Sequence, residues 1–195
     1  IRDRDVTLTI DAAVQHVCEK ELMKAIEKFK AHRGAVIIMN PRNGEILAYA
    51  VYPYFDPNNF KNATSFQTKN WTLTDVFPPG STFKIITTLE YIRENPDYEN
   101  YSYSCNGSIT ENDFTIHCYN NAVHGTQDLK QSFANSCNSS YANIGLSLDT
   151  DSLSDLCSDL MFDKTLPGNF ETSKSQFKLT DESPESMKMQ TAIGQ

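Results

Sequence analysis

The amino-acid sequence predicts an α+β fold in which helices pack on the faces of an antiparallel sheet. Two apolar segments, Ala35–Met39 and Glu45–Tyr52, flank the turn-forming pair Asn43-Gly44, and this pattern is typical of a β-hairpin. The segment after Asp11 repeats apolar residues at steps of three and four, as an amphipathic helix does. Since the apolar face of that helix has to be covered, we expect it to pack on the hairpin.

The first elements of the chain follow from short sequence signals. Val6–Ile10 alternates β-branched and apolar residues and predicts a short strand. Asp11 is a favourable N-cap for the helix that follows, and Gly34 lies near the expected C-terminal end of that helix. The residues predicted on its buried face are Val14, Val17, Cys18, Leu22, Ala25, Ile26 and Phe29.

A second long helix is predicted from Ser81 to about Asn95. A Pro-Pro-Gly sequence interrupts the chain directly before it. The charged residues Glu90 and Glu94 are expected on its solvated face. The residues expected on its buried face are Ile85, Ile86, Leu89 and Ile92.

The remaining residues predict further helices after an irregular region. Residues 96–125 are polar and aromatic, and they predict one short hairpin. Two helices are expected over Asp128–Ala134 and Ser139–Leu148, and a last helical segment over Pro184–Ile193. Another amphipathic helix is marked by Leu153, Leu156, Cys157, Leu160 and Met161.

The charge of the chain narrows the classes of partner. The 195 residues include 17 basic and 25 acidic side chains, which give a formal net charge of -8. An acidic molecule repels nucleic-acid phosphates, so no nucleic-acid partner is expected. No uncharged apolar run approaches the roughly 20 residues that span a bilayer, so we expect any leader or membrane anchor to lie upstream of Ile1.

The cysteines leave two interpretations open. Five are present, with irregular spacing and no CxxC pair, and a Cys105–Cys118 disulfide is possible in an oxidising compartment. The other interpretation is a zinc site built from His117, Cys118 and His124, with Cys105 and Cys137 nearby. Because the spacing departs from the usual zinc-binding patterns, a disulfide or a packing role is favoured and no metal is expected.

The strongest candidate for chemistry is the sequence Pro-Gly-Ser-Thr-Phe-Lys that ends at Lys84. Ser81 and Lys84 are three residues apart, so in the first turn of a helix the Oγ and Nζ atoms can approach each other. A serine hydroxyl becomes a good nucleophile when a neighbouring base takes its proton, and a lysine can be that base when burial lowers its pKa. The simpler alternative is that Ser81 caps the helix and Lys84 is solvated.

A second candidate group is Ser136-Cys137-Asn138, at the expected break between two helices. The Ser136 hydroxyl can relay a proton to a leaving group, and the Asn138 amide can both donate to and accept from a peptide bond. The simpler alternative is that Ser136 and Asn138 cap the next helix.

The two motifs, in this order, resemble the SxxK and SxN motifs of penicillin-binding proteins. The resemblance extends over nearly the whole chain and is to the transpeptidase domain of the high-molecular-weight class, class B. It implies a β-lactamase/transpeptidase-like fold. The other matching segments are VTLTIDAAVQ, RGAVIIMNPRNGEILAYA, DPNNF, HGTQDLKQSFANSCNSSYANIG and AIGQ.

Position by position, the resemblance implies roles for four residues. Ser81 is the acylated nucleophile and Lys84 its general base, while Ser136 shuttles a proton and Asn138 anchors the substrate amide. The implied reaction is D,D-transpeptidation of D-alanyl-D-alanine stem peptides of peptidoglycan, in which the terminal D-alanine leaves and the acyl group passes to an amine of a neighbouring strand. β-Lactam antibiotics are expected to acylate Ser81, and no cofactor is implied.

The third motif of the family, KTG or KSG, is absent, because the only Lys-Thr pair, Lys164-Thr165, is followed by Leu166. We therefore expect residues 1–195 to be the N-terminal part of a single serine transpeptidase domain with an incomplete sheet. The expected partners then include the C-terminal remainder of the domain, on the same or a second chain, and a cell-wall polymerase in the full protein. The resemblance also implies that the protein is located at the extracytoplasmic face of the cell membrane.

Two other functions compete with this one. A β-lactamase or β-lactam sensor of the same superfamily shares the motifs, although the LTID opening is more typical of transpeptidases. A non-catalytic cell-wall scaffold or binding module is the other alternative. The complete set of Ser81, Lys84, Ser136 and Asn138 favours an enzyme over the scaffold.

Overall fold

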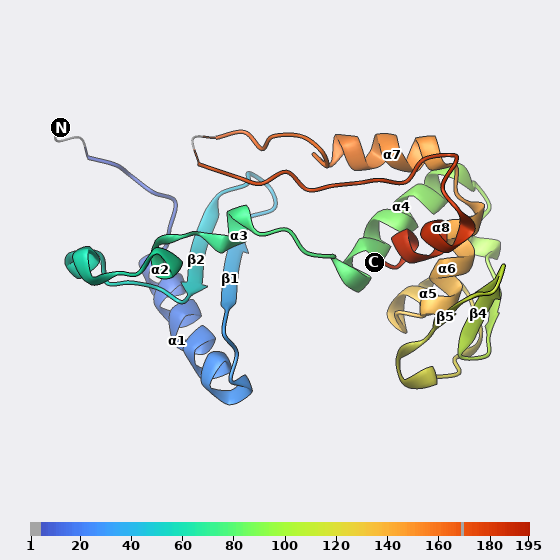
Figure 1. The fold of residues 1–195 in the computed structure, drawn as a ribbon, viewed down its shortest axis with the longest axis horizontal. Helices are drawn as coiled ribbons and strands as arrows, with labels where there is room; N and C mark the ends of the chain where they lie inside the picture. Colours follow the sequence, from blue (N-terminus) through green and yellow to red (C-terminus); the bar gives the residue numbers. More distant parts are fainter. Residues whose placement is uncertain (1–4, 169) are drawn as a thin grey trace. The chain divides into compact units, whose positions relative to one another are not determined.

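The structure is a computed structural model that describes residues 5–168 and 170–195. The chain divides into two compact units, Ile1–Asp75 and Val76–Gln195, which are drawn in Figure 1 and described separately below. Helices and small antiparallel sheets make up both units, so the predicted α+β class is confirmed. No helix within these described ranges is long and apolar enough to cross a membrane.

The first unit is a helix packed on a hairpin. Helix α1 (Ala12–Phe29) precedes strands β1 (Gly34–Met39) and β2 (Ile46–Tyr52), which pair antiparallel from Gly34 opposite Tyr52 onwards, with an irregularity in the register at Ile38/Met39. The hairpin and the packing of helix α1 on it are therefore as predicted. The core between them consists of Cys18, Leu22, Ile26, Ala48 and Ala50.

The ends of α1 agree with the sequence at one terminus only. The Asp11 carboxylate accepts from two backbone N–H groups of the first turn, which confirms the predicted N-cap. The C-cap is Lys30, in a left-handed conformation, whereas Gly34 already belongs to β1. Val17 and Phe29 are exposed, so the prediction of their burial was wrong: both line an open groove beside Ala35 and Val36 of β1.

The predicted strand Val6–Ile10 is not a strand in the structure. The Thr9 hydroxyl donates to the Ile46 carbonyl at 2.6 Å and the Asp11 N–H donates to the Leu47 carbonyl, but no ladder forms. The alternation of Val6–Ile10 satisfies the pattern of a strand, yet a strand also needs a partner along its length.

Short helices complete the first unit. Two of them begin after side-chain caps, at Asp56 and Thr64, of which Thr64 forms a capping box with Gln67. Their bounds are η1 (Pro57–Asn62), α2 (Ser65–Thr68) and α3 (Trp71–Thr74).

The second unit is mainly helical and holds the larger core. Its helices are η2 (Gly80–Phe83), α4 (Lys84–Glu94), η3 (Tyr98–Asn100), η4 (Tyr119–Asn121), α5 (Leu129–Ala134), α6 (Asn138–Ser147), α7 (Thr150–Asp159) and α8 (Glu185–Ala192). Figure 1 shows α6 and α8 close together within this unit, and the two helices are in contact. The helices predicted over the second half of the chain are thus confirmed.

Two small sheets lie beside these helices. Strands β4 (Ser108–Glu111) and β5 (Phe114–His117) form the predicted short hairpin. Its loop residues both have positive φ, as a two-residue hairpin turn favours. Strands β3 (Tyr103–Cys105) and β6 (Gly125–Gln127) lie before and after this hairpin in the sequence and pair with each other antiparallel. The sequence did not predict these two strands, because both segments are short and polar.

The buried face of α4 differs from the predicted one, although Ile86 is half-buried and packs against the core as predicted. Lys84, Thr87 and Glu90 are buried, whereas Ile85 and Leu89 are 53% and 47% exposed. The buried face packs against α6 and α7, and the Thr87 hydroxyl donates to the Ala192 carbonyl at 2.9 Å. Glu90 pairs with Arg93 of the same helix and is buried, so the expected solvation of Glu90 was wrong.

Candidate active site

A tight turn presents Ser81 at the start of α4. Gly80 has φ +61, a conformation that glycine adopts without strain, and Ser81 follows it inside the 3-10 turn with an exposed side chain. The N-cap of this turn is Pro79, so Ser81 is not the helix cap that the simpler alternative required. The arrangement leaves the Ser81 hydroxyl free of a capping role.

Lys84 lies at the centre of the predicted group. Its Nζ atom is 3.3 Å from Ser81 Oγ and 3.0 Å from Ser136 Oγ. It also lies 2.8 Å from the Ser136 carbonyl oxygen and 2.7 Å from Asn138 Oδ1. The structure thus brings together all four residues that the sequence singled out. Lys84 is only 1% exposed, and the alternative of a solvated lysine is wrong.

Burial shifts the protonation equilibrium of Lys84 toward the neutral amine. Burial lowers the pKa of the Lys84 ammonium from its usual 10.5 to about 8, although the Cys137 and Cys118 thiols act in the opposite direction. The face of the Tyr141 ring lies 5.4 Å from Nζ and gives weak cation–π support to the charged form. A pKa near 8 leaves a substantial neutral fraction at physiological pH.

A strained turn places Ser136 and Asn138 around Lys84. Ser136 has φ 49, in the left-handed region that non-glycine residues rarely adopt. The N-cap of α6 is Cys137, which makes no side-chain capping bond, so neither Ser136 nor Asn138 is the cap. Asn138 accepts from Lys84 through Oδ1 and donates through Nδ2 to the His117 carbonyl at 3.0 Å. These bonds fix the amide plane beside Lys84.

The C-terminal AIGQ segment lies against the Ser81 turn. The Gly80 N–H donates to the Gly194 carbonyl at 2.9 Å. Gly194 has φ +82, and a Cβ atom there would lie 2.0 Å from the Gly80 carbonyl oxygen. The segment was noted in the sequence only as part of a resemblance. The conformation and the close approach both explain why glycine is required.

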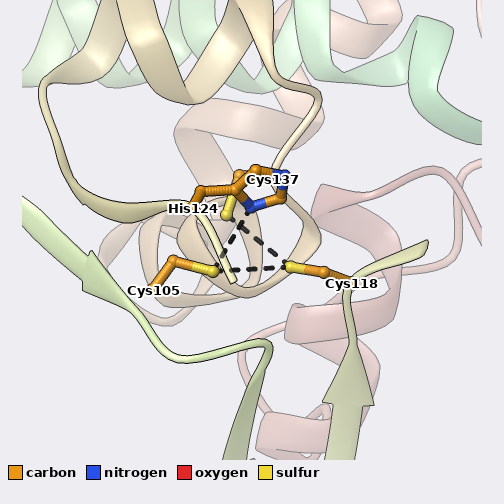
Figure 2. A group of neighbouring side chains, drawn as sticks. All are labelled: Cys105, Cys118, His124 and Cys137. Atoms are coloured by element: carbon orange, nitrogen blue, oxygen red, sulfur yellow. Dashed lines mark hydrogen bonds between the residues drawn. The ribbon is translucent and has the colours of Figure 1, made fainter. Parts of the chain in front are cut away.

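The four residues of a second cluster, outside this group, are among those of the zinc site that the sequence disfavours. Figure 2 shows Cys105, Cys118, His124 and Cys137 pointing toward one another, and their possible ligand atoms all lie within 4.8 Å of one another. His117 is not a member of this cluster; its carbonyl accepts a hydrogen bond from Asn138 Nδ2. All five cysteines lie in the described ranges and all are free thiols, so the disulfide between Cys105 and Cys118 is not formed.

Both the group around Lys84 and the cysteine cluster belong to the second unit, and the first unit contributes no residue to either. A pocket of about 690 Å³ lies there between α1, β2 and the following loop. Its lining includes Gln15, His16, Tyr49 and Asn70, which present no nucleophile paired with a base.

A serine and a lysine at one helix start, facing a Ser-x-Asn turn, define the class of serine enzymes that react with penicillin. Residues 34–195 match the family described as the penicillin binding protein transpeptidase domain, and the chain belongs to this family. The resemblance stated from the motifs is therefore confirmed.

Curated relatives agree with this assignment. The chain is 38% identical over 115 residues to the probable peptidoglycan D,D-transpeptidase PbpC of Pseudomonas aeruginosa, a match that covers 58% of the chain and 20% of the relative. It is 31% identical over 160 residues to the stage V sporulation protein D of Bacillus subtilis, which covers 81% of the chain and 25% of the relative. The chain thus spans about a quarter or less of the length of these relatives.

Solved structures show the same fold. The D,D-transpeptidase domain of a peptidoglycan glycosyltransferase from Eggerthella lenta matches with a TM-score of 0.82 at 24% identity, over 97% of this chain and 46% of that one. Penicillin-binding protein A of M. tuberculosis, in a penicillin G acyl-enzyme complex, matches with a TM-score of 0.82 at 22% identity, over 96% of this chain and 47% of that one. The expected β-lactamase/transpeptidase-like fold is confirmed.

Proposed function

We propose that this chain carries the serine nucleophile of a peptidoglycan D,D-transpeptidase. The observation that carries the proposal is the contact of one buried amine, Lys84 Nζ, with both the Ser81 and the Ser136 hydroxyls. An amine with a lowered pKa between two hydroxyls can take a proton from one and pass it on through the other. A capping serine and a solvated lysine would need neither the burial nor the second hydroxyl.

The first half of the reaction forms an acyl-enzyme. Neutral Lys84 takes the Ser81 proton while Ser81 Oγ attacks the carbonyl carbon of the penultimate D-alanine. The positive end of the helix that begins at η2 and continues as α4 favours the negative charge that develops on the substrate oxygen. The peptide bond then breaks, and the proton passes from Lys84 through Ser136 to the amine of the departing D-alanine.

The second half transfers the acyl group. An amine of a neighbouring stem peptide attacks the Ser81 ester, its proton returns to Ser81 Oγ through Lys84, and a new peptide bond replaces the ester. Asn138 orients the donor strand: one N–H of its amide is used by the His117 carbonyl, and an amide has a second one to offer a substrate carbonyl. No step requires a cofactor.

The proposal extends to partners and location. Stem peptides that end in D-alanyl-D-alanine are the substrates, and β-lactams are covalent inhibitors at Ser81. A cell-wall polymerase is the partner of the full protein, which acts at the extracytoplasmic face of the membrane. The names of the relatives, which include peptidoglycan D,D-transpeptidases of Pseudomonas aeruginosa and Escherichia coli, support the proposed class of substrate.

The experiment uses the full-length protein that contains these residues. It is incubated with a synthetic stem pentapeptide, with and without an acceptor amine such as a D-amino acid, and released D-alanine and transfer product are measured. We expect both products from the wild type and neither from Ser81→Ala, whereas Ser102→Ala, an exposed serine of the same unit, leaves both unchanged.

The same protein separates the competing functions. A penicillin adduct that persists for many minutes supports a transpeptidase, whereas rapid turnover of the drug supports a β-lactamase. D-Alanine release from the pentapeptide that is equal in wild type and Ser81→Ala would contradict the proposal. A complete lack of both release and drug adduct would instead support the non-catalytic scaffold.

A further inference from the structure

Four potential metal ligands converge beside the Ser136-Cys137-Asn138 turn (Figure 2). They come from four separate places in the second unit. Cys105 ends β3, Cys118 follows β5, His124 precedes β6, and Cys137 is the N-cap of α6. The three thiols are buried, and the imidazole is half-buried. Four side chains that can each offer a ligand atom to a metal ion therefore meet at one place in the second unit.

The spacing of the sulfur atoms fits a tetrahedral metal centre. Sγ of Cys118 lies 3.7 Å from Sγ of Cys105 and 3.7 Å from Sγ of Cys137. With zinc–sulfur bonds of about 2.3 Å, two ligands of a tetrahedron lie about 3.8 Å apart. The His124 Nδ1 atom lies 3.3 Å from Cys105 Sγ, on the same side as the sulfurs. A disulfide would instead require a separation of about 2.05 Å.

The groups around the four ligands suit thiolates rather than apolar packing. The Ser139 hydroxyl donates to Cys105 Sγ at 3.2 Å, and the Gly107 N–H donates to the same sulfur at 3.4 Å. Ser139 Oγ also lies 3.4 Å from the sulfurs of Cys118 and Cys137. Hydrogen bonds to coordinating sulfurs are a usual feature of metal centres, where they orient the ligands and temper their charge.

We propose that Cys105, Cys118, His124 and Cys137 bind one Zn²⁺ ion in a closed, structural site. Three thiolates and one imidazole are a donor set that thiophilic divalent metals prefer. Binding releases the three thiol protons, and the imidazole coordinates in its neutral form. Four protein ligands leave no open position, so the ion holds structure and does not activate water.

The site joins the metal to the second motif. Cys137 is flanked by Ser136 and Asn138, both of which contact Lys84 Nζ. Fixing the Cys137 sulfur therefore fixes the turn that carries the two motif side chains. The ion acts as a positioning element for this turn, an effect that rests on the proposed function, whereas metal binding itself does not.

The test measures metal binding on the full-length protein. Bound metal is removed with a chelator under reducing conditions, and the protein is then titrated with Zn²⁺ alone. The bound metal is quantified by inductively coupled plasma mass spectrometry. We expect one equivalent to rebind and the melting temperature to rise. The variants Cys105→Ser, Cys118→Ser and Cys137→Ser should lose the tightly bound ion, whereas Cys157→Ser, at a buried thiol outside the cluster, should retain it.

A ligand exchange keeps the test decisive if those variants fail to fold. His124→Cys changes a half-buried loop residue and converts the donor set to four thiolates. With Co²⁺ as the probe, we expect the wild type to show the absorption of a tetrahedral three-thiolate site and this variant to show that of a four-thiolate site. Identical cobalt spectra for the two proteins would overturn the proposal.

Two further results would also overturn it. One is the absence of any stoichiometric metal in the reduced wild type. The other is full retention of zinc in all three cysteine variants. Penicillin labelling is measured in parallel on the metal-free and the zinc-loaded protein. Zinc binding without labelling in either state would contradict the proposed function but not the metal site. Labelling without zinc binding would contradict the metal site but not the proposed function.

Discussion

The Lys84 amine lies 3.0 Å from the Ser136 hydroxyl, although 52 positions separate the two residues in the sequence. The contact joins the start of α4 to the turn before α6. It is therefore a product of the tertiary fold, and it converts two separate short motifs into one group of side chains. The proposed proton transfer among Ser81, Lys84 and Ser136 requires this contact.

Removal of the Lys84 amine should abolish acylation of Ser81. Lys84→Met keeps the length of the side chain and its burial but supplies no base. Because general bases contribute about 10²–10⁴ in rate, we expect the second-order rate constant for penicillin acylation to fall by that factor. The measurement is stopped-flow or intact-mass kinetics, with the melting temperature as a control for folding. An acylation rate within about threefold of the wild type would show that another group is the base.

The rate of acylation should rise with pH through the pKa of Lys84. Burial places this pKa at about 8, and only the neutral amine accepts the Ser81 proton. The rate constant should therefore increase tenfold per pH unit well below 8 and level off above it. A profile measured between pH 6 and 10 would be incompatible with the assignment if it were flat over this range.

The same shift predicts a change in stability with pH. The unfolded chain has a Lys84 pKa near 10.5, whereas the folded chain has one near 8. Between these values the unfolded state binds more protons, so the contribution of Lys84 makes the protein more stable as the pH rises from 8 to 10.5. The melting temperature of the wild type, relative to that of Lys84→Met at the same pH, should therefore rise as the pH increases over this range.

Gly194 should be needed for the shape of the Ser81 turn. In Gly194→Ala the new Cβ would lie 2.0 Å from the Gly80 carbonyl oxygen, so the turn has to move. The matched control is Gly44→Ala, which has a similar φ of +77 but nothing within 4 Å of the added carbon. The control should lose only the roughly 1–2 kcal/mol of left-handed backbone strain. Gly194→Ala should lose more stability and also slow penicillin acylation, and equal effects of both changes would contradict the close approach.

Sequence patterns identified the local parts of the fold and of the site. The N-cap at Asp11, the hairpin around Asn43-Gly44 and the order of the helices all depend on neighbours in the chain, and they were confirmed. The four motif side chains were found because each motif is short and contiguous. Local signals of this kind survive in a single sequence because the interactions behind them are local.

Long-range packing accounts for what the sequence left unpredicted. The aliphatic face of α4 at Ile85 and Leu89 is exposed, while Glu90 is buried, because the neighbouring helices cover the polar face. The cluster of three cysteines and His124 draws its members from four elements, so no spacing pattern of a contiguous metal motif applies. Only the fold brings such residues together.

Glu90 should destabilise the protein at neutral pH. Burial raises the pKa of its carboxyl group above the usual 4.5, although Arg93, at 3.1 Å, acts in the opposite direction. A raised pKa means that the folded state binds more protons, so stability is lost as the pH rises through the shifted value. Glu90→Gln should therefore melt closer to the wild type at pH 5 than at pH 8, where the variant should be the more stable protein.

The matched control for this change is Glu99→Gln, at an exposed position of the same unit. Its melting temperature should follow the wild type at both pH values. A Glu90→Gln protein that is less stable than the wild type at pH 8 would show that the Arg93 ion pair outweighs the cost of burying the carboxylate.

The most direct test of the account is the site of covalent attachment of penicillin on the full-length protein. The protein is incubated with penicillin G, its intact mass is measured, and the labelled peptide is sequenced after proteolysis. We expect one adduct per chain, attached to Ser81, and none on Ser81→Ala. An adduct on another residue, or one that persists unchanged in Ser81→Ala, would contradict it.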